Sequence, residues 1–216
     1  MYHQKIALII LAYLLSFCST TLSEKEKEAI RLEKNQREIK KINAADIISA
    51  VYARGIVITT MADSLLSARL EFMIQEYGII PTFKQYEKIV KQILDSISNV
   101  NNAEIKRISD KTSSMELEKF EKELLEAYRF NMKGNLELQD NVQTIDDNLL
   151  LYSKPLIINN ALCLNCHGII GKDLTDLGEK MFQSLNTQDT ITGYKKGDLI
   201  GMWSVWFRKK EIINSL

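Results

Sequence analysis

Hydrophobic and polar positions follow a helical repeat through the first two thirds of the chain. Residues 45–73 are rich in Ile, Val, Leu, Ala and Met with few polar interruptions. We therefore predict one long helix there, buried on more than one side. Two amphipathic helices should follow, the first capped by Thr82 and the second running from Ser114 to Gly134. Their apolar residues recur at three- and four-residue steps, beginning with Tyr86, Ile89, Val90, Ile93 and Ile97.

The last third of the chain has the pattern of strands. Residues 148–158 form an apolar run in which Pro155 marks a sheet edge or a bulge. Residues 190–194, a turn at 195–198 and a Trp- and Val-rich run at 199–208 predict a hairpin. A short strand at 103–110 and a short helix at 174–185 complete the elements that we expect.

The N-terminus has the pattern of an export signal. His3 and Lys5 precede an apolar run, Ile6–Phe17, of about 12 residues. A membrane-spanning helix needs roughly 20, so residues 1–20 are interpreted as a signal peptide or lipoprotein leader. Leu15-Ser16-Phe17-Cys18 resembles a lipoprotein cleavage box with Cys18 as the lipidated residue, although Phe17 stands where that pattern has a small residue. Lipidation of Cys18 and ordinary cleavage nearby both remain open.

Three segments are therefore expected: the leader at 1–20, a charged helical spacer at 21–43 and one folded domain at 44–210. The spacer opens with Ser23-Glu24-Lys25-Glu26, which has the spacing of a capping box. With 45% hydrophobic and 26% charged residues, the chain can bury one full core. We expect the acidic residues Glu121 and Glu123 to lie on the solvated side of their helix.

Charge and residue types limit the function. The net charge is zero, so no basic surface for nucleic acid is indicated. We find no nucleophile with a histidine base and predict no enzyme activity, apart from a weak peroxidase-like activity if a bound iron were left open. No transmitter module is present, so any signal would have to pass to another protein.

The most informative chemistry is Cys163-Leu164-Asn165-Cys166-His167, a C-x-x-C-H run of the kind that attaches c-type haem. Two thiols at this spacing can form thioethers with one porphyrin, and the following histidine can then bind its iron. With three Cys and two His in the chain, chance would produce the run in roughly one of a few thousand such sequences. We expect a single haem c held by Cys163, Cys166 and His167.

Two other interpretations of the run are weighed. A structural zinc site needs four ligands, and only His3 and Cys18, both in the leader, remain to complete it. A redox dithiol of the thioredoxin type would follow a strand in a βαβ unit, and no such alternation is visible. The alternative that stays open is a haem-free binding module with a Cys163–Cys166 disulfide or redox dithiol.

A second motif indicates a family. Gly193-Tyr194-Lys195-Lys196-Gly197-Asp198-Leu199-Ile200-Gly201 follows the C-x-x-C-H run, which is itself preceded by residues 152–156. Together they resemble the single-haem c-type cytochrome domain with a PAS-like fold, a family of exported cyanobacterial haem proteins and bacterial sensor-kinase ectodomains. The resemblance covers about residues 42–208. It implies an α+β fold, with an antiparallel sheet flanked by helices and a long N-terminal helix.

The distal side of the iron departs from this family. Some members place a cysteine from an upstream helix there, but residues 84–99 of this chain contain none. Without the leader His167 is the only histidine, so the sixth ligand would be Met, Lys, water or absent. Met202, in the last strand, is the candidate that we name; other methionines are Met73, Met115, Met132 and Met181. Aromatic residues that could line the haem or belong to the sheet core are Tyr152, Phe182, Tyr194, Trp203 and Trp206.

The sequence thus predicts a periplasmic mono-haem c-type cytochrome that acts in electron transfer or in haem-based redox or ligand sensing. Its localisation would be outside the cytoplasmic membrane, with membrane attachment if Cys18 is lipidated. Its partner would be a redox or signalling protein of unknown identity, and not nucleic acid. The long charged helix leaves room for a homodimer.

Overall fold

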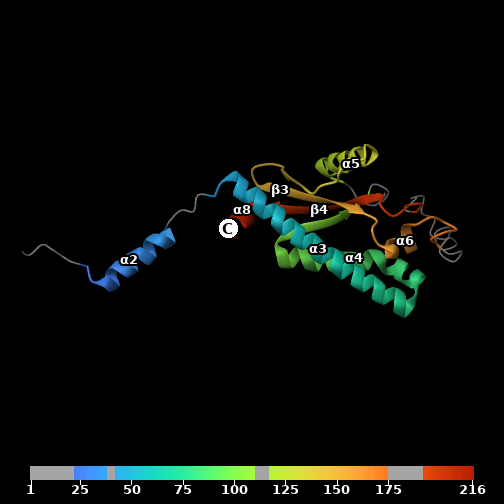
Figure 1. The fold of residues 1–216 in the computed structure, drawn as a ribbon. Coiled ribbons are helices and arrows are strands. Elements are labelled where there is room, and N and C mark those ends of the chain that lie inside the picture. Colours follow the sequence, from blue (N-terminus) through green and yellow to red (C-terminus); the bar gives the residue numbers. More distant parts are fainter. Residues whose placement is uncertain (1–21, 38–41, 110–116, 175–191) are drawn as a thin grey trace, which may run out of the picture. The chain divides into compact units, whose positions relative to one another are not determined.

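The computed structural model describes residues 22–37, 42–109, 117–174 and 192–216 (Figure 1). The chain divides into two units, residues 1–41 and 42–216. In the first, α2 (Glu24–Arg37) begins with the predicted capping box, since the Ser23 amide donates to Glu26 Oε2 at 2.8 Å and the Glu26 amide donates to Ser23 Oγ at 3.3 Å. The predicted leader lies outside the described residues.

The second unit is built on a four-stranded antiparallel sheet. Its strands are β1 (Ala103–Ile108), β2 (Asn141–Thr144), β3 (Leu149–Ile157) and β4 (Leu199–Arg208), in the order β1-β4-β3-β2. The strand that comes last in the sequence is therefore central and pairs with both β1 and β3. This arrangement confirms the predicted α+β fold with an antiparallel sheet flanked by helices.

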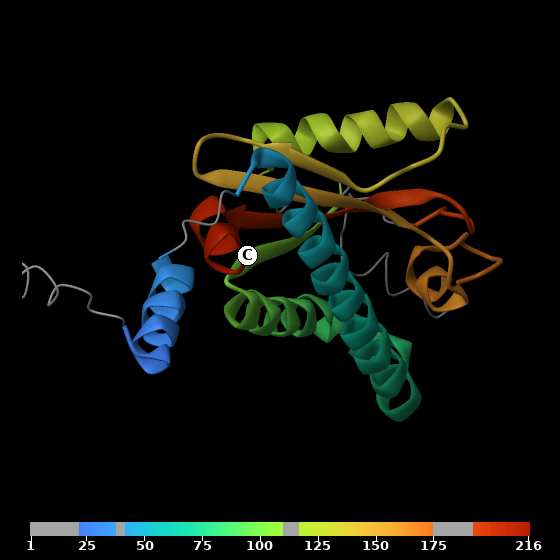
Figure 2. The ribbon, with the colours of Figure 1, turned by 60° about the vertical axis from the view of Figure 1, so that its left-hand side comes forward.

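One face of the sheet is covered by α3 (Ala44–Tyr77) and α4 (Ile79–Asn101) (Figure 2). Val51 and Ile58 of α3 are among the residues that pack on Tyr152, Val205 and Phe207 of the sheet. Gly55 allows this close approach, because a Cβ there would lie 2.3 Å from the Tyr152 ring. The predicted long helix is confirmed, but our expectation that it is buried on more than one side is wrong: its outer side is exposed.

Among the described helices, α3 is long and apolar enough to cross a membrane by length and composition alone. Its most apolar 18-residue window has a mean hydropathy of 1.3, and 28% of that window is buried. The contacts of Val51 and Ile58 with the sheet identify α3 as the core helix of this domain.

The start of α4 differs from the prediction. The chain becomes helical at Ile79, directly after Gly78, whose φ of 81° lies in the left-handed region that favours glycine. Thr82 is therefore inside the first turn, where its hydroxyl donates to the Gly78 carbonyl at 2.8 Å, and it is not the capping residue. Pro81 is tolerated here because the first-turn amides of a helix have no partner within the helix.

The other face of the sheet is covered by α5 (Lys119–Lys133), which ends at Gly134 as predicted. The predicted start at Ser114 lies outside the described residues. Leu124, Leu125 and Tyr128 of α5 pack with Ile108 and Met202 of the sheet.

Glu121 points inward from α5 and is completely buried, so the prediction that it lies at the surface is wrong. Its Oε1 accepts hydrogen bonds from Ser204 Oγ at 2.7 Å and from Trp206 Nε1 at 2.9 Å. These partners on β4 satisfy the carboxylate, as a buried charge requires. Glu123, two residues further along α5, is exposed.

The predicted hairpin is only partly correct. The turn at 195–198 and the strand β4 are present, but residues 192–194 form no strand. β4 pairs with β3 and β1 instead, and it leads into a short helix, α8 (Lys209–Asn214), that we did not predict. Pro155 lies beyond the segment of β3 that pairs with β2, where one side of β3 has no partner strand among the described residues. The predicted helix at 174–185 falls almost wholly outside the described residues.

Candidate haem site

The C-x-x-C-H run forms a short helix, α6 (Ala161–His167), which opens with Asn160 accepting a hydrogen bond from the Leu162 amide at 3.0 Å. Residues three and four apart lie on the same side of a helix. Cys163, Cys166 and His167 therefore share one side of α6. All three are partly buried, and both thiols are free. The structure thus brings together the three residues that the sequence assigned to the haem.

An apolar cluster packs against α6. Ile158, Tyr194 and Ile200 are buried there, with Cys163 and Leu164 beside them. Ile200 reaches this cluster through an irregularity in the sheet: Leu156 pairs with Gly201 and Ile157 with Leu199, so β4 has one extra residue at this point. Bulges of this kind turn a side chain out of the regular alternation.

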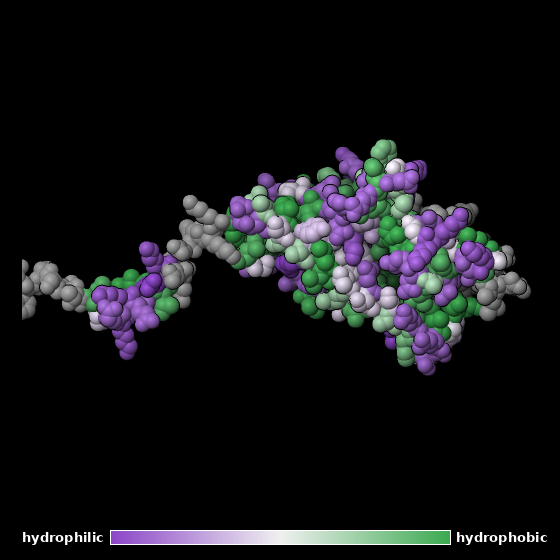
Figure 3. Space-filling model, viewed as in Figure 1, coloured by the Kyte–Doolittle hydropathy of each residue, from purple (hydrophilic) through white to green (hydrophobic). Residues whose placement is uncertain are grey.

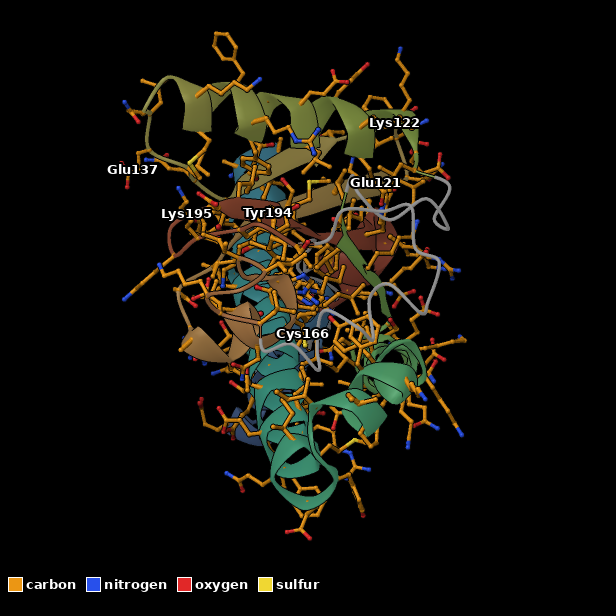
Figure 4. The ribbon with its side chains drawn as sticks, turned by 90° about the vertical axis from the view of Figure 1, so that its right-hand side faces the viewer. Glu121, Lys122, Glu137, Cys166, Tyr194 and Lys195 are labelled. Carbon is orange, nitrogen blue, oxygen red and sulfur yellow. The ribbon has the colours of Figure 1, made fainter. Side chains whose placement is uncertain are left out.

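The second motif is hydrogen-bonded directly to the first. The Tyr194 amide donates to the His167 carbonyl at 2.9 Å, and the Gly193 amide donates to the Gly168 carbonyl at 2.8 Å. The Tyr194 ring meets the His167 ring edge to face, with centroids 6.3 Å apart. Figure 4 labels Tyr194 and Cys166 in a view from the side on which α6 lies in Figure 1. The chain after α6 therefore returns to hold the C-terminal end of that helix.

The rest of the second motif forms the turn that makes this return possible. Gly193 and Gly197 have positive φ angles of 87° and 96°. The Gly197 amide donates to the Ile158 carbonyl at 2.7 Å, just before α6, and the Asp198 carboxylate accepts from the Lys195 amide at 2.7 Å. Gly201 passes so close to β1 that a Cβ would lie 1.9 Å from the Ile108 carbonyl oxygen. The spacing of this motif thus follows from backbone geometry around α6.

A cation that the sequence analysis missed faces the same region. Arg107 of β1 lies opposite Trp203 of β4 and is hydrogen-bonded to the Tyr86 hydroxyl of α4. Burial lowers the pKa of its guanidinium, while nearby Cys163 and Asp63 act in the opposite direction. The available signal was its position, because Ala103 and Ile105 alternate with it on the buried side of β1.

Asp63 of α3 balances part of this charge. Its carboxylate accepts a hydrogen bond from Trp203 Nε1 at 2.9 Å and lies 3.7 Å from Lys154 Nζ. Trp203 is thus oriented by a polar partner on this face of the sheet, whereas Trp206 points to the opposite face, toward Glu121. Of the aromatic residues predicted to line a haem, Phe182 lies outside the described residues, and among those described Tyr194 is the one in the cluster beside α6.

Met202 is not brought to this site, and our prediction of it as the distal ligand is not supported by its position. Neighbouring residues of a strand point to opposite faces, and Trp203 faces α3. Met202 accordingly faces α5, where it is completely buried among Leu124, Leu125 and Tyr128. Met73 lies in α3 and Met132 in α5, whereas Met115 and Met181 fall outside the described residues.

The model of the Tll0287-like family matches residues 20–208. The chain belongs to this family. The crystal structure of the cyanobacterial haem protein Tll0287 matches with a TM-score of 0.52 and 19% sequence identity, covering 77% of this chain and 97% of that one. No curated protein matches the chain. Membership of the Tll0287-like family confirms the resemblance that the two motifs indicated.

Proposed function

We propose that this chain is an exported mono-haem c-type cytochrome, in which Cys163 and Cys166 form thioethers with one haem and His167 binds its iron. The observation that carries the proposal is the common side of α6 on which these three residues lie. When bound, haem supplies a centre that gains or loses one electron. The family match and the description of Tll0287 as a haem protein support haem as the cofactor.

The residues around α6 fit such a group. Ile158, Tyr194 and Ile200 offer apolar contacts, as a porphyrin ring requires. Arg107 provides a positive charge near Cys163, and haem carries two propionates that such a charge would stabilise. The Tyr194 amide holds the His167 backbone, and the Tyr194 ring lies edge to face against the imidazole.

The redox-dithiol alternative is less favoured. Burial raises the pKa of the Cys166 thiol to about 11, with a smaller contribution from Cys163. A thiol with that pKa is protonated at neutral pH, and thiolate is the form that reacts in disulfide exchange. Cys163, Cys166 and His167 are only partly buried, which would suit a haem whose edge passes electrons to a partner protein, so we propose electron transfer or haem-based redox or ligand sensing as its role.

The test is to express the full chain with c-type haem maturation machinery and to record spectra after denaturing chromatography. Haem should remain attached to the wild-type chain and be absent from Cys163→Ala/Cys166→Ala. Cys18→Ser is the matched control and should keep its haem, while losing membrane attachment if Cys18 is lipidated. A wild-type chain without covalent haem would refute the proposal. A reduced spectrum that carbon monoxide leaves unchanged would support an electron carrier, and one that shifts would favour ligand sensing or weak peroxidase activity.

A further inference from the structure

The outer side of α3 is an exposed surface without charge. Between Asp46 and Arg69, none of the exposed residues of this helix is charged. Val57 is 58% exposed and Leu65 48%, which is unusual for large apolar residues of a core helix. The two charged residues in this stretch are partly buried and form hydrogen bonds within the domain: Arg54 donates to the Asn101 carbonyl at 2.8 Å, and Asp63 accepts from Trp203.

These exposed residues form two parallel rows. Positions four apart make the first row, which consists of Ser49, Ala53, Val57, Met61 and Leu65. The second row, beside it, consists of Ile56, Thr60, Ser64 and Ala68. Rows of residues four apart are the ridges that pack into the grooves of another helix. In the view of Figure 3, green and pale residues follow the course of α3.

We propose that this surface binds the same surface of a second copy of the chain, with the two α3 helices antiparallel about a two-fold axis at Val57. The row is self-complementary about that point. Small residues precede Val57 in the row and large ones follow it, so that Met61 of one copy would lie opposite Ala53 of the other. Asp46 and Arg69 lie eleven residues before and twelve after Val57, so opposite charges would meet at both ends.

A hollow at one end of the row supports this register. It has a volume of about 370 Å³ and is lined by Ile48, Ser49, Tyr52 and Val142. Ser49 lies eight residues before Val57 and Leu65 lies eight after it. At about 1.5 Å per residue, each is roughly 12 Å from the axis. The exposed Leu65 of one copy would therefore enter the hollow beside Ser49 of the other.

A second copy fits this surface better than a membrane does. Helices that lie on membranes carry Lys and Arg next to their apolar side, and α3 exposes neither before Arg69. The surface is about 30 Å long and 10 Å wide, or roughly 300 Å² of flat area per copy. This is small beside the roughly 800 Å² per partner of a standard interface, so we expect a weak dimer with a dissociation constant in the micromolar range.

Sedimentation equilibrium of the mature protein over a range of micromolar concentrations tests the dimer. Wild type should associate, and Val57→Asp should stay monomeric. The matched control is Val100→Asp on α4, because Val100 is 76% exposed and should tolerate the charge without loss of association. Thermal unfolding by circular dichroism checks that all variants are folded. A wild-type chain that is monomeric throughout, with or without binding to phosphatidylglycerol vesicles, would overturn the proposal.

The register has its own test. Ser49→Leu fills the hollow, so it should weaken the dimer about tenfold or more. Adding Leu65→Ala removes the side chain that no longer fits and should restore part of the affinity. If Ser49→Leu instead strengthens association, the surface acts as a general hydrophobic contact and the two-fold register at Val57 is wrong.

Discussion

Replacement of Glu121 by alanine should be among the most destabilising single changes in the domain. The Glu121 side chain is completely buried, and Ser204 and Trp206 both donate to its Oε1. Its Oε2 also accepts from the Glu118 amide at 3.0 Å, and Lys106 Nζ lies 3.6 Å from Oε1. Alanine would leave two inward-pointing donors without an acceptor, at about 1–3 kcal/mol each. We expect a total loss of about 3–5 kcal/mol in the free energy of unfolding, as for breaking a buried ion pair.

Urea denaturation followed by circular dichroism measures this loss. With a slope of about 2 kcal/mol per molar urea, the midpoint should fall by roughly 2 M. Glu123→Ala is the control on the same helix: the Glu123 side chain is 56% exposed and its Oε1 lies 3.7 Å from Lys119 Nζ, so its loss should cost at most about 1 kcal/mol. If Glu121→Ala shifts the midpoint no more than Glu123→Ala, the hydrogen-bond network does not stabilise the fold as argued. The haem spectrum should be unchanged in both variants, because α5 and α6 contact different clusters.

Four further outcomes are expected. Met202→Leu should leave the reduced haem spectrum unchanged and cost less than about 1.5 kcal/mol; a spectral shift would restore Met202 as a ligand. Gly55→Ala should destabilise the domain by roughly 1–3 kcal/mol, because the new methyl group would overlap the Tyr152 ring. Each kcal/mol should lower the thermal midpoint by about 2–4 °C, and an unchanged midpoint would contradict that contact. Burial raises the pKa of Tyr128 to about 12 from an ordinary 10, so the unfolded chain releases this proton at a lower pH than the folded chain does. The contribution of Tyr128 to the free energy of unfolding should therefore be constant below pH 10 and fall by about 2 kcal/mol as the pH rises to 12. Tyr128→Phe should remove that part of the fall. Arg107→Gln should lower the reduction potential measured by titration, and Arg107→Lys should preserve it, if the positive charge acts on the haem.

The residues of the candidate site could be predicted from the sequence because their function depends on short spacings. Cys163, Cys166 and His167 are neighbours in the chain, and Gly193 and Gly197 of the second motif mark a turn. The link between the two motifs could not be predicted. It is made by amide-to-carbonyl hydrogen bonds from Gly193 and Tyr194, which leave no pattern in side chains.

Positions that depend on which face of the sheet a helix covers were harder to predict. Strand alternation indicates that Met202 and Trp203 point to opposite faces, but not which of them faces α3 and which faces α5. The burial of Glu121 could not be predicted for the same reason, since its partners Ser204 and Trp206 lie more than eighty residues away in the sequence. The outer side of α3 has the composition of a core helix, so composition alone could not reveal its exposure.

The position of β4 in the sheet sets an order for maturation. β1 and β3 do not pair with each other; each pairs with β4, which is synthesised after both. The sheet therefore cannot close, and the Gly193–Tyr194 segment cannot cover α6, until the end of the chain has emerged. During that interval the thiols of Cys163 and Cys166 remain open to the enzymes that would attach haem. If haem is attached as we propose, the last strand would then close over it, so attachment should come before the sheet is complete.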